Sequence, residues 1–142
     1  MQLPPREMDR PEIAALFYFV LMNPNDVEQL FPFLAPRVEW ILSAASPQTL
    51  GDEVPPNSIK FSRKEGLRQL ALYFRDSLKV ISGDLTGCIP HHHLVFSFGR
   101  VRLQTAGMDQ PAETNLAARI TFQGPTITRV QIRISWPLVF ET

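Results

Sequence analysis

The chain has 142 residues, 44% of them hydrophobic and 20% charged, which is the composition of an ordinary globular domain rather than a disordered or fibrous protein. Its 14 lysines and arginines balance 14 acidic residues, so the usual electrostatic basis for binding nucleic acid or an anionic membrane is missing. The single cysteine excludes an internal disulfide and any zinc site with two or more cysteine ligands. The length fits one domain, which we expect to cover 1–142.

An unbroken apolar run at 13–22 is too short for a membrane span, which needs about 20 residues. Glu7, Asp9 and Glu12 precede this run, where a signal peptide would carry positive charge. The run therefore predicts a folded helix in a cytoplasmic protein that binds no membrane. Pro11 favours the start of this helix, because proline is well tolerated at the first helical position.

Two further helices are predicted from capping residues and apolar spacing. Asn25 is expected to cap a short second helix, with Glu28 three residues later and Pro32 kinking it or ending it early. The third helix begins at a predicted capping box, in which Ser62 and Glu65 satisfy each other's free backbone donors. Its buried stripe has helical spacing and comprises Leu67, Leu70, Ala71, Phe74 and Leu78.

Alternating apolar and polar residues predict the strands. One strand is expected at 38–42, and the proline-containing segment 43–61 is expected to be a loop, acting either as a functional lid or as the cover of a sheet edge. Further strands are predicted at 89–98, ending in a turn at Phe98-Gly99, then at 100–104, at 116–122, and at 130–136 after a turn at 123–126. Helices first and strands afterwards favour an α+β fold with an antiparallel sheet.

The order and spacing of several segments resemble the SnoaL-like proteins of the NTF2-like superfamily. Segment 26–40 resembles the helix-then-strand opening of that family, and 61–68 resembles the start of its third helix, where a glycine usually stands in place of Arg63. Segments 116–122 and 127–135 look like its last two strands. The resemblance implies a cone, in which three N-terminal helices pack on the concave face of a curved, mostly antiparallel sheet and leave a pocket between them. The family includes polyketide cyclases, ketosteroid isomerase, dehydratases and modules without chemistry.

The residues of an isomerase-like mechanism are not matched in this chain. That mechanism needs a carboxylate base near the end of the first strand, where Trp40 stands, and alternation points the neighbouring Glu39 to the other face. It also needs an acid on the strand at 116–122, but the inward residues of this strand are all apolar. The mechanism needs a tyrosine as well, and Tyr18 lies near the expected tyrosine position without matching it.

Three adjacent histidines, at 91–93, offer a different base. His92 shares its parity with Leu94 and Phe96, so it is expected on the core side of a strand, either as a general base or as a hydrogen-bonded structural histidine. A bulge at Pro90 would reverse this parity. No second ligand pair accompanies Cys88 and His91, so neither a metal nor a cofactor is expected.

A set of apolar residues is expected to line the pocket and bind substrate, namely Phe17, Leu21, Trp40, Phe74, Ala118, Ile120 and Trp136. A second, polar set is expected on the opposite face of the sheet, either solvated or paired across a homodimer, namely Arg102, Arg119, Arg129, Arg133, Gln104, Thr121 and Gln131.

Three functions remain open. The first is a module that binds a small hydrophobic molecule without chemistry, because the predicted pocket has no paired acids. The second is an enzyme of the cyclase, isomerase or dehydratase type that acts on a polyketide-like or carbonyl substrate, with His92 as base and Tyr18 or Tyr73 as proton donor. The third is a dimerisation domain with a filled cone.

Overall fold

The computed structural model describes residues 8–44, 54, 58–105 and 107–135. In chain order, its elements are α1 (Arg10–Leu21), the 3-10 helix η1 (Pro24–Phe33), β1 (Leu34–Ala44), β2 (Ile59–Ser62), α2 (Arg63–Asp76), β3 (Val80–His91), β4 (Leu94–Leu103), β5 (Ala112–Gln123) and β6 (Thr126–Ile134). The predicted α+β class is confirmed.

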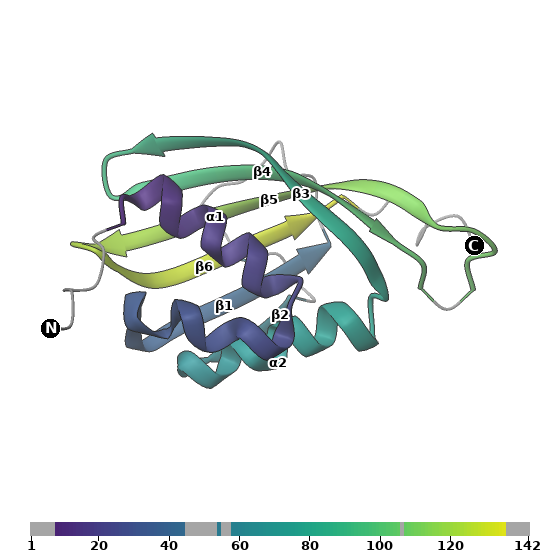
Figure 1. The fold of residues 1–142 in the computed structure, drawn as a ribbon, viewed down its shortest axis with the longest axis horizontal. Helices are drawn as coiled ribbons and strands as arrows, with labels where there is room; N and C mark the ends of the chain where they lie inside the picture. The colour runs from purple at the N-terminus through teal and green to yellow at the C-terminus, as the bar shows by residue number, and fades with distance from the viewer. Residues whose placement is uncertain (1–7, 45–53, 55–57, 106, 136–142) are drawn as a thin grey trace, which may run out of the picture.

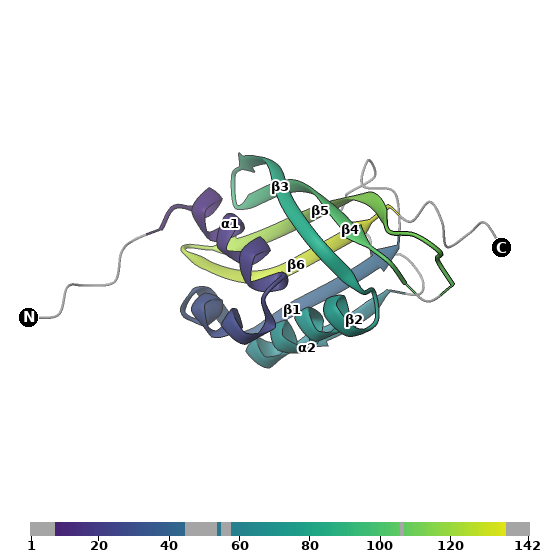
Figure 2. The ribbon, with the colours of Figure 1, turned by 45° about the vertical axis from the view of Figure 1, so that its right-hand side comes forward.

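The strands form one sheet in the order β2-β1-β6-β5-β4-β3. Neighbouring strands are antiparallel except β1 and β6, which run parallel with Trp40 beside Val130. The helices lie together on one side of this sheet, and β3 and β4 bend over α1 (Figures 1 and 2). We call this side the helix-covered face and the other the open face.

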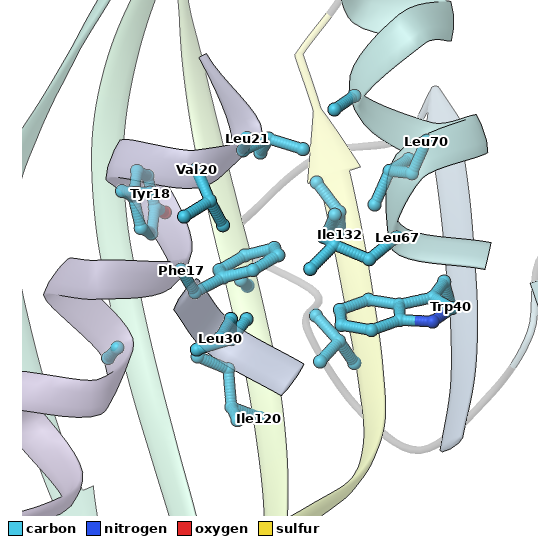
Figure 3. Close-up of a cluster of buried hydrophobic side chains, with 14 of the residues drawn as sticks. Phe17, Tyr18, Val20, Leu21, Leu30, Trp40, Leu67, Leu70, Ile120 and Ile132 are labelled. Atoms are coloured by element: carbon cyan, nitrogen blue, oxygen red, sulfur yellow. The ribbon is translucent and has the colours of Figure 1, made fainter. Parts of the chain in front are cut away.

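Every second residue along a strand points to the helix-covered face, and most of these residues on β1, β5 and β6 are apolar. The core therefore lies between the helices and the sheet. Helix α1 contributes Phe17 and Leu21, and α2 contributes Leu67 and Leu70, all of them almost fully buried (Figure 3). The matching strand residues on β1, β5 and β6 are Val38, Trp40, Leu42, Leu116, Ala118, Ile120, Phe122, Val130, Ile132 and Ile134.

The start of α1 is fixed by a capping box that the sequence reading missed. Asp9 accepts from the backbone N–H of Glu12, and the Glu12 carboxylate accepts from the backbone N–H of Asp9. The next residue, Arg10, donates to the carbonyl of His92 at 2.6 Å and to the carbonyl of Gly124 at 2.9 Å. Its guanidinium also lies over the ring of Phe122. Arg10 therefore joins the first helix to both hairpin turns, β3–β4 and β5–β6.

The second helix differs from its prediction. It is a 3-10 helix whose N-cap is Asn23 rather than Asn25, and Asn23 donates to the carbonyl of Phe19 instead of capping η1. Pro24 is tolerated at the first helical position, whereas Pro32 lies inside the helix, lacks a backbone N–H and interrupts the α-helical bonding pattern. Pro32 lies one residue before the end of the helix, as the expected early end requires.

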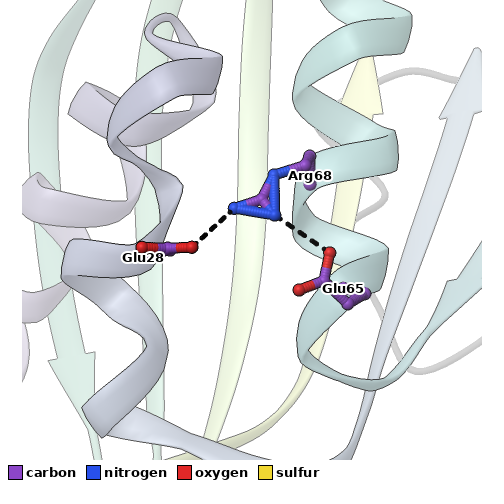
Figure 4. A network of polar contacts seen from close by, with 3 residues as sticks. All are labelled: Glu28, Glu65 and Arg68. Atoms are coloured by element: carbon purple, nitrogen blue, oxygen red, sulfur yellow. Dashed lines mark hydrogen bonds and ion pairs between the residues drawn. The ribbon is translucent and has the colours of Figure 1, made fainter.

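The predicted capping box of the third helix is wrong in part. Ser62 is the N-cap, but its side chain makes no capping bond, and the Glu65 carboxylate binds Arg68 instead. Arg68 also binds Glu28 of η1, so one guanidinium bridges two helices (Figure 4). These side chains are exposed enough that the ion pairs add little stability.

The strands around residues 80–103 also differ from the prediction. The predicted strand at 89–98 is in fact the end of β3 and the start of β4, so the turn lies at His92-His93 and not at Phe98-Gly99. Gly99 continues β4, paired with Leu85 and Leu116. The predicted loop at 43–61 contains the short strand β2, and its residues 45–53 and 55–57 lie outside the described residues. The turn at 123–126 is confirmed, with Gly124 in the left-handed region at φ 62°.

Candidate functional site

The position expected for a catalytic base is occupied by a buried structural residue. Trp40 has no exposed surface, and its ring stacks on Phe17 with centroids 5.9 Å apart. Its indole Nε1 donates to the carbonyl of Arg63 at 2.9 Å, which ties β1 to the start of α2. Glu39 is exposed on the open face, as alternation predicted. Neither residue presents a carboxylate on the helix-covered face.

Tyr18 lies on α1 against the helix-covered face of β4. Its phenol accepts a long hydrogen bond of 3.4 Å from Ser97, and Gly99 of the same strand leaves room for its ring. Burial raises the pKa of Tyr18 far above its ordinary value, and the bond from Ser97 opposes this only in part. Tyr18 therefore stays protonated and can donate. The inward residues of β5 opposite it are apolar, so it lacks the acidic companion that an oxyanion site of the isomerase type needs.

The expectation that His92 lies on the core side of a strand is wrong. His92 lies in the β3–β4 turn with φ 55°, and its side chain is exposed, as are those of His91 and His93. The parity prediction failed because it assumed a strand through these residues, whereas they form the turn between two. The turn places His92 outside the packed core. Tyr73, the other predicted donor, packs on Phe61 of β2.

Six of the seven predicted binding residues come together in the core. Phe17, Trp40, Ala118 and Ile120 have no exposed surface, and a side chain without accessible surface borders no water-sized space. Trp136 lies outside the described residues. The remaining two, Leu21 and Phe74, reach the edge of the core, where a groove begins.

This groove, which we call the terminal groove, lies where the C-terminal ends of α1 and α2 meet the start of β3. It encloses about 270 Å³ including its open mouth and is lined by Leu21, Met22, Ala71, Phe74, Arg75, Val80 and Ile81. Ile81 is 58% exposed at the start of β3. The sequence reading missed this site because it assigned no strand to 80–88; the apolar pair Val80-Ile81 directly after the third helix was the available signal.

The charges beside the terminal groove come from the end of α2. Arg75 Nε lies 2.7 Å from Asp76 Oδ1, and both side chains are more than half exposed. The hydrogen bond from Arg75 lowers the pKa of Asp76, helped by the positive charges of Arg75 and Lys79. Arg75, which lines the groove, is therefore paired with Asp76, and polar atoms make up most of the accessible surface of the groove.

The open face of the sheet carries an apolar area rather than a uniform polar surface. Ile89 of β3 is 57% exposed and pairs with Phe96 of β4, and Phe98 is also exposed. Of the predicted polar set, Arg102 is exposed, whereas Gln131 and Arg133 are buried. The exposed apolar area of this face therefore lies over β3 and β4.

Within the described ranges, no group of three or more histidine, cysteine or acidic side chains is arranged to hold a metal. The same part of the chain contains no helix with the length and apolar character needed to cross a bilayer. That the protein functions without a metal or a cofactor remains a prediction.

No protein-family model and no curated protein matches the chain. Solved structures match over most of its length. A protein of ketosteroid isomerase-like fold from Catenulispora acidiphila, in complex with trimethylamine, is 14% identical with a TM-score of 0.69, covering 94% of this chain and 92% of its own. An NTF2-like protein from Burkholderia xenovorans is 14% identical with a TM-score of 0.66, covering 88% of each chain. A protein from Mesorhizobium loti, provisionally assigned as a SnoaL-like polyketide cyclase, is 18% identical with a TM-score of 0.60, covering 88% of this chain and 98% of its own.

These likenesses show that the chain has the SnoaL/NTF2-like fold, as the resemblance of its segments implied. At such identities the likeness defines the fold and leaves the activity open, because one fold of this kind hosts many unrelated functions.

Proposed function

We propose that the protein is a non-catalytic module of the SnoaL/NTF2-like fold that binds a small hydrophobic molecule in the terminal groove. The observation that carries this proposal is the position of Leu21 and Phe74. Both belong to the core, and both also line a groove that opens to solvent, together with the apolar side chains of Met22, Val80 and Ile81. Apolar walls with a few polar groups at the rim are typical of small-molecule sites.

The chemistry of the described residues supports binding without turnover. Trp40 stands at the base position with its N–H already bonded, and Tyr18 has no acidic companion. His92 lies in an exposed turn. An enzyme that moves a proton next to a carbonyl needs a base within hydrogen-bond reach of its substrate, and none of these residues provides one at the terminal groove.

A complex of another protein with the same fold supports the proposal that the ligand is a small organic molecule. The Catenulispora acidiphila protein was solved with trimethylamine, a molecule of four heavy atoms. The enclosed part of the terminal groove is about 40 Å³, far below the usual range for ligand sites, about 300–1,000 Å³. We therefore expect a small molecule that lies partly across the open mouth of the groove, rather than a peptide.

The proposed partner is a second copy of the chain, which would pair through the open face. Ile89, Phe96 and Phe98 form its apolar centre. Arg100 lies between Asp84 and Asn115, and Arg102 lies beside Glu113. Alternating charges next to an apolar centre suit contact between two identical surfaces, because a two-fold axis brings the same patch of each copy together.

Two residues of β3 separate these proposals experimentally. Ile81 and Ile89 have nearly equal exposure, 58% and 57%, but Ile81 lines the terminal groove and Ile89 lies on the open face. The probe is N-phenyl-1-naphthylamine, a neutral fluorophore that brightens in apolar sites. We expect Ile81→Asn to weaken its binding about tenfold and to leave the sedimentation mass unchanged, since the lost apolar contact is worth about 1–2 kcal/mol.

The variant Ile89→Asn should do the reverse, keeping probe affinity and shifting the protein from dimer to monomer. Equal loss of probe binding in both variants would contradict the groove as the site. A wild-type protein that sediments as a monomer at all concentrations would contradict the dimer.

A further inference from the structure

Met22, the C-cap residue directly after α1, fills a notch in strand β3. A Cβ atom built on Gly83 would lie 2.6 Å from Met22 Cε and 3.1 Å from Met22 Sδ, with Val101 Cγ1 at 3.3 Å on the far side. Real Cβ atoms do not approach other atoms this closely, so the absence of a side chain at Gly83 creates the space that the Met22 thioether occupies. We call this space the Gly83 notch.

The same Met22 side chain lines the terminal groove. Met22 therefore borders the groove, and its terminal methyl is seated in the Gly83 notch. The methionine is half-buried and unbranched, and such a side chain changes conformation at low cost because it has three flexible bonds and no branch to repack. The Met22 side chain therefore separates the terminal groove from the Gly83 notch, and a change in its conformation would connect the two.

We propose that the Gly83 notch is the deep end of the binding site, and that the ligand carries an unbranched alkyl chain that takes the place of the Met22 side chain. This rests on the proposed function, since it places the ligand in the terminal groove, and it adds the chemical class. The notch holds the methionine side chain, which is a flexible chain of a few heavy atoms, so a ligand chain of similar length and flexibility would fit there. Val101 and Gly83 contribute only hydrocarbon and backbone there, so the inserted part of the ligand is apolar.

The experiment measures binding of the straight-chain alkan-1-ols from butanol to decanol, by displacement of N-phenyl-1-naphthylamine and by the methyl NMR signals of Val101. In the wild-type protein, affinity should rise about fourfold per methylene until the groove is filled, and then more slowly, because each longer chain must also displace the Met22 side chain; the Val101 methyls should shift at that stage. Met22→Ala removes three heavy atoms, so its affinity should keep rising about fourfold per methylene for about two to three methylenes beyond that point, with the same shift of the Val101 methyls.

Gly83→Ala is the matched control, because its added methyl fills the notch from the other side; Gly83 does not have a left-handed φ, so alanine fits the backbone. In the Met22→Ala/Gly83→Ala double variant, the gain in chain length should shrink by about one methylene. Thermal unfolding curves verify that each variant is folded.

Three outcomes separate the claims. Levelling off at the same chain length in wild-type and Met22→Ala proteins, with Val101 unmoved, would overturn the notch and leave the groove standing. Binding by Met22→Ala but not by the wild-type protein would support the notch and overturn the proposed function. Absence of binding in both would overturn the two together.

Discussion

The indole Nε1 of Trp40 donates to the main-chain carbonyl of Arg63, which lies 2.9 Å away at the start of α2. Arg63 itself has φ 66°, a left-handed conformation that L side chains rarely adopt. Gly66, one turn further on, lets the helix approach the indole, because a Cβ there would lie 2.8 Å from Trp40 Cδ1. Three features of the backbone are therefore arranged around one tryptophan, at the position where an isomerase of this fold would hold its base.

The strained residue in this arrangement gives the first prediction. Arg63→Gly should stabilise the protein by about 1 kcal/mol, because glycine adopts a left-handed φ without the steric cost of a Cβ. The Arg63 side chain is exposed, so little contact is lost. The measurement is the free energy of unfolding in urea. Lys64→Gly, one residue later in the helix, is the control and should destabilise by about 1 kcal/mol. Destabilisation of the same size in both variants would contradict the strain at Arg63.

The second prediction concerns two glycines on the same hairpin. Gly99→Ala should destabilise by about 1–3 kcal/mol, because its Cβ would meet the Asp84 carbonyl oxygen at 2.6 Å and Tyr18 Cε1 at 2.8 Å. Gly87→Ala meets nothing within 4 Å and should change stability by less than about 0.5 kcal/mol. Chemical denaturation measures both. Similar effects of the two substitutions would show that α1 does not press Tyr18 against β4.

Arg10 gives the third prediction, because it joins α1 to two hairpin turns. Arg10→Lys keeps the positive charge but cannot reach the carbonyls of His92 and Gly124 together, so we expect a loss of about 1–2 kcal/mol. Amide hydrogen exchange should quicken at Phe122, whose N–H is bonded to the carbonyl of His93. The exposed Arg100 on β4 provides the control, and Arg100→Lys should leave that exchange rate unchanged. If the two variants behave alike, Arg10 does not hold the turns.

The fourth prediction follows from the raised pKa of Tyr18. In the unfolded chain the phenol loses its proton near pH 10, whereas in the folded protein it keeps it to higher pH. The unfolded state then binds fewer protons, so stability is fully present below about pH 10 and falls above it, by about 1.4 kcal/mol per pH unit. Tyr18→Phe should lack this fall, and Tyr73→Phe should retain it. Unfolding free energies between pH 8 and 11 that fall equally in wild type and Tyr18→Phe would refute the buried, protonated phenol.

Much of the fold could be predicted because its signals are local. The alternation of Leu116, Ala118 and Ile120, and the glycine-proline turn after them, mark β5 and β6 in the sequence, and the structure confirms both. The first helix was recognisable from its proline and its spacing. These elements each have one apolar face, so periodicity alone identifies them.

The β3–β4 hairpin could not be predicted in the same way. Strand β3 lies at the edge of the sheet, carries three glycines or prolines among its residues and has two irregular points in its register, so its alternation is broken. Its turn consists of histidines, of which His92 has a left-handed φ without being a glycine. Contacts made far along the chain, such as that of Arg10, hold this turn in place and are invisible to local rules.

The candidate site was predictable only in part for the same reason. Leu21 and Phe74 were identified by helical spacing. The walls formed by Val80 and Ile81 depend on an edge strand that the pattern did not reveal, and the position of Met22 depends on a glycine across the sheet. The predicted contact between a ligand and the core residues around Trp40 remains a prediction.

We propose that the ligand enters the terminal groove and not the packed interior. Methyl NMR spectra recorded during titration with N-phenyl-1-naphthylamine test it directly, because the probe's rings shift nearby signals. The methyls of Leu21, Val80 and Ile81 should move with increasing probe while those of Ile120 and Ile132 stay fixed. Shifts centred on Ile120 and Ile132 would contradict the account and place the ligand inside the cone.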